Sequence, residues 1–577
     1  MQTNHIKTIL KSAALILAIL SCAGGAFCQS INLTAGPTTA TMPDGTVVPM
    51  WGYFCGTAVT GSAATCAALN PASLSTTAPS TWSPVVITVP IAAPAGTATS
   101  LTINLTNNLS FTPTGATTAN TIPTSIVIVG QVGGGLGMLA QRTTTMSPDH
   151  SLAQGCPTWF IADPNTPPGV PCTANDSGAV PPTQGPRVQS FGTEVAAAGA
   201  TLVAPQVASG SALTWTNLRP GTYLLESGTH PSIQVPMGLI GVLVVTTVPA
   251  GTTAGTAYPG SGTGTTAALP VTYNAELPLE FSEIDPVQNK AVNTAVNTAG
   301  FSETAVWSGM NNVNGTGAVG CGQTHTCYPP AVNYTPFYYL INGRAFDKTH
   351  ATSSLFAAYV GIPGGATAPG TTGITGTVLA RLVNAGLRMH VPSIVNSLTT
   401  GFNGSGQATA LVSGFTLIAE DGNTVPGVQV AGATTVPAAP RVQTDVFMAA
   451  GKTFDVMINA FCPGALTCAT PALPIYDREL SLSGNSSDRD AGMVAYIGVN
   501  GAGLPAVSTA AGGLFGPAMA RNDAYAGLAA GQVFSVTDAS KGVIANDTNV
   551  YGVQLLAAPT GGTLTCNAQP QNPVAGI

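Results

Sequence analysis

The segment Leu218–Val245 reads LRPGTYLLESGTHPSIQVPMGLIGVLVV and predicts two strands separated by a short polar interruption. GTYLLE, before the interruption, and GLIGVLVV, after it, have the length and the apolar content of strands. Between them stand Ser227, Gly228 and Pro231, which are residue types that end strands and form turns. The segment therefore predicts two neighbouring strands, of which the second is a continuous apolar run.

Similar strand patterns occur on both sides of this segment. TSIVIVGQ (124–131) is a short continuous apolar run, FYYLINGRAFD (337–347) passes into an Asn-Gly turn, and FTLIAEDGN (415–423) passes into an Asp-Gly turn. No helical periodicity of useful length appears in the first unit, residues 30–250. Short strands with Gly and Pro punctuation are typical of antiparallel sandwiches, so the sequence predicts an all-β fold.

The length of 577 residues exceeds what one ordinary core contains, so we expect several domains. Strand-like sequence occupies two units, 30–250 and 270–500. Residues 251–269 are dominated by Gly, Thr and Ala and are interpreted as a linker. A second linker-like stretch covers 501–530.

The first unit resembles the multicopper oxidases. In that family the first cupredoxin domain ends in PGTYLYHSHxxxQxxMGLxGALVV and contains TSLHIHG, which match 220–245 and 124–130 here. The strand segments of 270–500 are similar, in order and spacing, to the second cupredoxin domain. The resemblance implies tandem cupredoxin-like Greek-key β-sandwiches over about 30–500. It is nearest to large, secreted, Thr/Gly-rich bacterial members, some of which are linked to manganese oxidation.

The same resemblance shows that the copper ligands are replaced. Family members bind a three-copper cluster with four His-x-His pairs, because residues i and i+2 of a strand point to one face. At the first-domain ligand positions this chain has Val127, Val129, Glu226 and Gly228. HCHxxxH, which joins the blue copper site to the cluster, does not occur in these residues. We therefore expect no copper cofactor, unless copper sites lie beyond residue 577.

The remaining histidines offer weak candidates. His230, with Glu226 on the same turn, is compatible with a weak metal site or a proton relay. The alternative is a loop histidine packed beside Pro231. His390 matches a structural histidine of the family and is interpreted as a partly buried histidine with satisfied hydrogen bonds. Three histidines lie in loop-like sequence and are assigned no role: His150, His325 and His350.

One acidic cluster stands out in this weakly charged chain. It consists of Glu276, Glu280, Glu283 and Asp285. Oxygen ligands of this kind suit Ca2+ or Mn2+. The competing interpretation, which we favour, is a solvated strand edge, because charged residues commonly protect edges from pairing.

The N-terminus has the features of an export signal. Lys7 and Lys11 precede the apolar run AALILAIL and a small-residue segment, so we expect a signal peptide over 1–28. Cleavage after Ala26 and cleavage after Cys28 are both compatible with it. A loose lipobox ending at Cys22 offers a lipid anchor as the alternative. The expected location is secreted, periplasmic or at the cell surface.

The cysteines agree with export into an oxidising compartment. Beyond the signal region they form close pairs that bracket loops, and each pair is predicted to be a disulfide: Cys55 with Cys66, Cys156 with Cys172, Cys321 with Cys327, and Cys462 with Cys468. Cys566 is left over.

The composition limits the partners. Charged residues make up 7% of the chain and form no basic run, so nucleic acid is not an expected partner. After the signal segment, no stretch has the length and apolarity of a membrane helix.

The end of the chain resembles a different module. Residues 531–577 include FSVTDASKGVIANDTNVYGVQLLAAPTGGTLTCNA, which is similar to the start of a bacterial immunoglobulin-like or cadherin-like repeat. Such a repeat normally continues for several strands, so we expect either a truncated sequence or the leading part of a longer polypeptide.

Two functional hypotheses follow. The first is a structural or binding protein at the cell surface or in the extracellular matrix, with self-association or surface partners. The alternative is a copper-dependent oxidoreductase, or a blue-copper electron-transfer protein, whose copper sites lie beyond residue 577.

Overall fold

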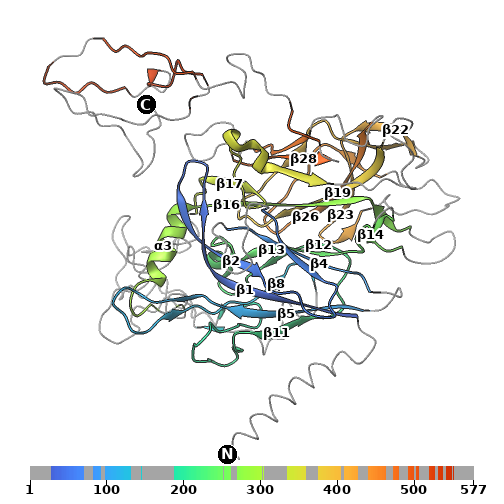
Figure 1. The fold of residues 1–577 in the computed structure, drawn as a ribbon, viewed down its shortest axis with the longest axis horizontal. Coiled ribbons are helices and arrows are strands. Elements are labelled where there is room, and N and C mark those ends of the chain that lie inside the picture. Colours follow the sequence, from blue (N-terminus) through green and yellow to red (C-terminus); the bar gives the residue numbers. More distant parts are fainter. Residues whose placement is uncertain are drawn as a thin grey trace, which may run out of the picture.

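The computed structural model shows an all-β protein, as predicted, in which two β-sandwiches pack against each other (Figure 1). The residues that it describes are 27–70, 82–92, 98–131, 144–145, 187–250, 253–260, 269–301, 303, 334–358, 374–403, 408–425, 440–462, 472–479, 492–499, 502–505, 519–526, 530–536, 541–548 and 550.

The first sandwich consists of two mixed sheets. One sheet has the order β11 (Ser211–Trp215), β5 (Thr99–Asn107), β1 (Phe27–Thr41) and β2 (Val47–Cys55). The other has the order β3 (Thr65–Ala68), β4 (Val85–Val89), β13 (Ile240–Val245), β12 (Gly221–Glu226) and β8 (Val127–Ile128). Strands β1 and β5 run parallel, as do β4 and β13, and the other neighbours are antiparallel.

The predicted strand pair is present as β12 and β13, in antiparallel register from Gly221 opposite Val245 to Glu226 opposite Ile240. Every residue of β13 is buried. Because side chains alternate along a strand, Leu243 and Val245 face the core of the first sandwich. Ile240, Val242 and Val244 face a second cluster that contains side chains of the other sandwich. The continuous apolar run thus reflects burial on both faces.

The second sandwich repeats the two-sheet arrangement. Its larger sheet has the order β17 (Tyr338–Ile341), β16 (Ala275–Ile284), β19 (Ile374–Asn384), β26 (Thr453–Cys462), β23 (Phe415–Glu420) and β24 (Asn423–Thr424), with β25 (Val442–Gln443) also on β23. Its smaller sheet has the order β18 (Leu355–Ala358), β28 (Val494–Val499), β27 (Leu473–Asp477) and β20 (Pro392–Ile394).

Shorter elements complete the chain between these strands. They are β6 (Ser110–Phe111), β7 (Asn120–Thr121), β9 (Thr144–Thr145), β10 (Arg187–Val188), α2 (Pro231–Gln234), β14 (Gly255–Tyr258), β15 (Val271–Tyr273), η4 (Lys348–Ser354), β21 (Leu398–Phe402) and β22 (Ala408–Ser413). Strand β14 lies within 251–269, the segment interpreted as a linker. It pairs with β15 and buries Ala257 and Tyr258, so this part of the segment is ordered sheet.

A helix that was not predicted from the sequence lies between β16 and β17 and packs against the first sandwich. Helix α3 (Pro286–Val296) follows β16 and lies beside β2 of the first sandwich (Figure 1). Asp285 caps it by accepting hydrogen bonds from the backbone N–H groups of Val287 and Gln288. Val292 and Val296 insert into the first core, so α3 fixes the second sandwich against the first.

A buried ion cluster also spans the contact between the sandwiches. The Asp455 carboxylate of β26 accepts hydrogen bonds from the Thr222 hydroxyl of β12 and from the Tyr258 phenol, each at 2.5 Å. Arg381 of β19 lies 3.2 Å from Asp455 and 2.8 Å from Glu276. The Arg381 side chain is completely buried. A residue of the first sandwich thereby completes the hydrogen bonding of a carboxylate in the second.

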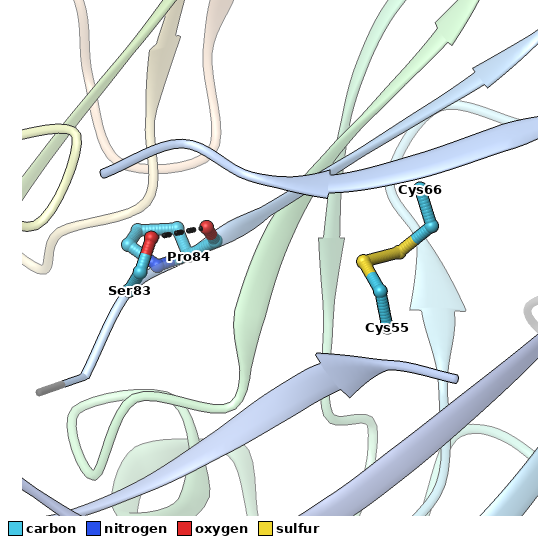
Figure 2. The surroundings of a disulfide bond; sticks show 4 residues. All are labelled: Cys55, Cys66, Ser83 and Pro84. Atoms are coloured by element: carbon cyan, nitrogen blue, oxygen red, sulfur yellow. Dashed lines mark hydrogen bonds between the residues drawn. A yellow bond between two sulfur atoms is a disulfide. The ribbon is translucent and has the colours of Figure 1, made fainter. Parts of the chain in front are cut away.

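The structure contains one of the predicted disulfides. Cys55 at the end of β2 bonds to Cys66 in β3, with Cα atoms 5.6 Å apart, and so joins the two sheets of the first sandwich (Figure 2). Nearby, the Ser83 hydroxyl donates to the carbonyl of Pro84 just before β4 (Figure 2). The pairs Cys156–Cys172 and Cys321–Cys327 lie outside the described residues, as do Cys468 and the side chain of Cys462.

The two ends of the chain are described only in part. Strand β1 begins at Phe27 and pairs Phe27 and Cys28 with β5, so it overlaps the predicted signal peptide 1–28 by two residues. Of the partial immunoglobulin-like repeat 531–577, the described pieces contain turns and no named strand, and the repeat stays a prediction. In the part of the chain that the structure describes, no helix has the length and apolarity needed to cross a bilayer.

Candidate functional site

The four positions that the resemblance assigns to copper ligands lie side by side. Strand β8 pairs with β12 so that Val127 is opposite Glu226. One step further, the backbone N–H of Val129 donates to the carbonyl of Leu224 at 2.9 Å. The sequence analysis therefore located a real junction between two strands, although none of the four side chains is a histidine.

Steric packing leaves no space for a side chain at Gly228. A Cβ atom at this position would lie 2.4 Å from Cγ2 of Val127 and 3.1 Å from the hydroxyl of Ser125. Contacts below 3.0 Å require the backbone or the neighbouring side chain to move. The side chain of Val127 thus fills the space that a side chain at position 228 would need.

Buried hydroxyl and amide groups form a hydrogen-bond network next to this junction. Thr124 and Ser227 both donate to the side-chain oxygen of Gln234, at 2.8 and 2.7 Å. The Gln234 amide donates in turn to the carbonyl of Pro123 at 2.8 Å. A second set of hydroxyls, 3.0 Å apart in each pair, consists of Ser125, Ser190 and Thr229. These side chains therefore satisfy one another's hydrogen-bonding groups in the interior beside the junction.

His230 does not pair with Glu226. It adopts a left-handed backbone conformation (φ 41°) immediately before α2. Its Nδ1 lies 2.7 Å from Oε1 of Glu303, and both side chains are buried. The proposed two-residue metal site and the simple packing beside Pro231 both overlooked this partner, which is 73 residues away in sequence.

His390 lies fully buried between two carboxylates. Its Nε2 is 2.5 Å from Oε1 of Glu283, and its Nδ1 is 2.8 Å from Oδ2 of Asp477. Burial lowers the pKa of the imidazole, but the hydrogen bonds to Asp477 and Glu283 outweigh burial and raise it to about 9. With carboxylates at both ring nitrogens, the ring is a protonated imidazolium that donates from each nitrogen. The histidine is therefore more deeply buried than the sequence analysis expected.

The favoured interpretation of the acidic cluster, a solvated strand edge, is wrong. The cluster lies on β16 and just beyond it, and β16 runs between β17 and β19. Glu280, Glu283 and Asp285 are all buried. Glu283 accepts from His390, Asp285 caps α3, and Glu276 pairs with Arg381. Burial raises the pKa of Glu280 to about 8, so this carboxyl is largely protonated at neutral pH.

Within the part of the chain that the structure describes, the donor groups are not arranged for copper. Among the described residues, no group of three or more His, Cys, Asp or Glu side chains is arranged to hold a metal ion. Of the described histidines, His230 and His390 are engaged by carboxylates, and His350 pairs with Asp347 at 2.8 Å on the surface. A copper site needs converging imidazoles and, for the blue type, a thiolate. The Ca2+ or Mn2+ alternative for the acidic cluster also lacks a converging oxygen set.

A cavity of about 350 Å³ opens at the same junction, between the two sandwiches. Its first wall contains Val129, Leu224 and Glu226, with the short helix α2 beside them. Its second wall consists of residues 385–387 after β19 and 450–451 before β26. Its size falls within the range of small-molecule pockets.

Hydrogen bonds fix the second wall. The Asn384 amide donates to the carbonyls of Arg388 and Met448 at 2.8 and 3.0 Å, and its side-chain oxygen accepts from the N–H of Gly386. Glu283 accepts from the N–H groups of Leu387 and Arg388, each at 3.1 Å. The buried Glu283–His390 pair thus holds the loop that forms this wall.

Glu226 is the charged group of the cavity. It ends β12 and is partly buried. Burial raises the pKa of its carboxyl to about 7. The position that the family resemblance assigns to a copper-binding histidine therefore carries a carboxyl group that titrates near neutral pH.

No protein-family model and no curated protein sequence matches the chain. Among solved structures, the chain is similar to the blue copper oxidase from Nitrosomonas europaea, with 13% identity, a TM-score of 0.37, and coverage of 82% of this chain and 86% of that one. It is also similar to multicopper oxidase mgLAC, with 13% identity, a TM-score of 0.37, and coverage of 83% and 88%.

A third structure is Fet3p, a multicopper oxidase that functions in iron import, with 17% identity and a TM-score of 0.35. The match covers 83% of this chain and 54% of Fet3p, so this chain spans about half of that protein.

Proposed function

We propose that this chain is a copper-free, cupredoxin-like double sandwich that serves as a structural or binding protein outside the cytoplasm. The proposal treats the junction of β8 and β12 as a former metal position that is now part of a packed interior and of a cavity wall.

The contact between Val127 and Gly228 carries this proposal. A single exchanged ligand would leave room for the original side chain, whereas here even a methyl group at 228 meets Val127 at 2.4 Å. The hydroxyls of Thr124 and Ser227 hydrogen-bond to Gln234 beside it. Restoring copper would therefore require several simultaneous changes in a close-packed region.

Two observations support a location outside the cytoplasm. The disulfide between Cys55 and Cys66 joins two sheets of the first sandwich, and such bonds persist in oxidising compartments. The N-terminal segment has the pattern of an export signal. The neutral, hydroxyl-rich composition is compatible with contacts to matrix or surface partners.

Metal analysis tests the proposal directly. The exported protein is loaded with copper, dialysed and measured by mass spectrometry and visible spectroscopy, beside a known blue-copper protein treated in the same way. We expect less than about a tenth of an equivalent of copper and no blue band, because a stable site needs at least three converging ligands. One retained equivalent would contradict the proposal, and its loss in a Glu226→Gln variant would locate the site at Glu226.

A further inference from the structure

The cavity between the sandwiches has one charged group in an otherwise neutral lining. Its walls include the aliphatic side chains of Leu224, Val235 and Leu387, and Glu226 supplies its carboxylate. Pockets that recognise small molecules combine an apolar lining with a few polar groups that fix the orientation of the ligand.

The Glu226 carboxylate lacks a counter-ion within the described part of the chain. No hydrogen bond or ion pair joins its side chain to another described residue, and burial is the cause of its raised pKa. A carboxylate that is partly withdrawn from water and has no counter-ion attracts a cation that enters the cavity beside it.

The neighbouring charged groups have other partners. His230, beside the first wall, pairs with Glu303 at 2.7 Å. On the second wall, the Arg388 guanidinium donates to the carbonyl of Tyr334 at 3.1 Å. Lys452 comes directly after Gly451 of this wall in the sequence, and its ammonium group pairs with Glu420 and with Asp421.

Tyr53 is another titratable residue that interacts electrostatically with Glu226. Its phenol donates to the carbonyl of Ser125 at 2.9 Å. Burial raises the pKa of Tyr53, and the negative charge of Glu226 adds to this effect. Tyr53 is therefore neutral in the accessible pH range, and Glu226 is the group that changes charge near neutrality.

We propose that this cavity binds a small organic monocation, with its ammonium group at Glu226 and its apolar body against Leu224, Val235 and Leu387. The proposal names a ligand class for the binding role proposed above, and it rests on the junction being free of copper. An anion of the same shape would be repelled by Glu226. A neutral analogue would fill the apolar part without compensating the carboxylate.

Calorimetric titration with 2-phenylethylammonium, and with 2-phenylethanol as the neutral isostere, tests this inference. At about pH 8 we expect the amine to bind at least about tenfold more tightly than the alcohol, because a charge-assisted hydrogen bond to the carboxylate is stronger than a neutral one. At about pH 5.5 amine binding should weaken at least about tenfold, because Glu226 is then protonated.

Matched variants locate the binding. Glu226→Gln should lose at least about tenfold in amine affinity, corresponding to about 1.4 kcal/mol, and should keep its urea midpoint. Glu479→Gln, the same change at an exposed site, should bind as the unaltered protein does. Val129→Phe should weaken both probes, because the new ring occupies part of the cavity.

Any one of three results would overturn the inference. The first is no binding of the amine at about 10 mM, a concentration well above a useful dissociation constant. The others are equal binding of the alcohol and full amine affinity in Glu226→Gln. Copper is measured on the same sample. A copper-free protein that ignores the amine refutes the ligand class and leaves the proposed function in place. A copper-bearing protein refutes the proposed function and, with it, the inference.

Discussion

His390 links the two sheets of the second sandwich through a pair of carboxylates. Its Nε2 lies 2.5 Å from Glu283 on β16 in the larger sheet, and its Nδ1 lies 2.8 Å from Asp477 on β27 in the smaller one. The imidazolium therefore forms a charged bridge through the interior. Because Glu283 also holds the backbone of residues 387–388, the bridge connects the core to the cavity wall.

Replacing this histidine should be severely destabilising. In His390→Asn, two buried carboxylates lose their shared cation, and breaking a buried ion pair in this way costs about 3–5 kcal/mol. Urea unfolding of the purified variant measures the loss. His350→Asn is the matched control, because His350 is exposed and its pair with Asp347 should contribute less than about 1 kcal/mol. Equal stability of the two variants would show that the bridge contributes nothing.

The same bridge predicts a loss of stability in mild alkali. The pKa of His390 is raised from 6.5 to about 9 in the folded protein. A raised pKa contributes stability fully below about pH 6.5 and loses it as the pH passes through about 9, and a shift of this size corresponds to about 3 kcal/mol. The depressed pKa of Asp477 acts separately, in acid. The free energy of unfolding should fall between about pH 6.5 and 9.5. In His390→Asn the fall should be smaller and should end near pH 8, because burial raises the pKa values of Glu226 and Glu280 to about 7 and about 8 and these carboxyls contribute their own decrease.

Arg381 should stabilise the buried ion cluster that lies where the two sandwiches meet. Burial lowers the pKa of its guanidinium, but Glu276 and Asp455 outweigh burial, so the charge is retained. Arg381→Met should cost about 3–5 kcal/mol, because the Asp455 carboxylate is left without its cation. In the double variant with Asp455→Asn the cost should be smaller than the sum of the single costs by at least about 1 kcal/mol. Additive costs in urea unfolding would show that the two side chains act independently.

The disulfide between Cys55 and Cys66 should stabilise the first sandwich. It closes a loop with a sequence separation of 11. On the chain-entropy model such a loop contributes about 3 kcal/mol. Replacing both cysteines by alanine should lower the free energy of unfolding by that amount. Peptide mapping without reductant checks the bond itself, and separate peptides containing Cys55 and Cys66 would contradict it.

Local sequence patterns predicted much of the fold. The apolar runs of β12 and β13 and the Gly and Asn turns between strands identify the all-β class, because they are properties of neighbouring residues. Helix α3 was missed although its start carries a local signal, Asp285 at the N-cap followed by Pro286. The absence of helical periodicity elsewhere favoured strands throughout.

The chemistry of the site depends on distant partners, which one sequence does not reveal. Glu283 was expected at a solvated edge, but His390 meets it from 107 residues away. The partner of His230 is Glu303, and the cavity at Glu226 exists only because residues 385–387 of the second sandwich face it. The resemblance located the junction of β8 and β12 in the sequence. The contacts around that junction could be described only from the three-dimensional structure.

The fit between Gly228 and Val127 provides a direct test of how far the former ligand position has closed. Gly228→Ala should cost about 1–3 kcal/mol, because its methyl group would lie 2.4 Å from Cγ2 of Val127 and overpack the junction. Combined with Val127→Ala, which removes the opposing atom, the substitution should cost at least about 1 kcal/mol less than the two single costs added together. At Gly503 an added methyl group would meet nothing within 4 Å, so Gly503→Ala should stay within about 0.5 kcal/mol of the unaltered protein. If Gly228→Ala is as well tolerated as Gly503→Ala in urea unfolding, the junction is loose enough to accept side chains, and the steric argument against copper ligands at this position fails.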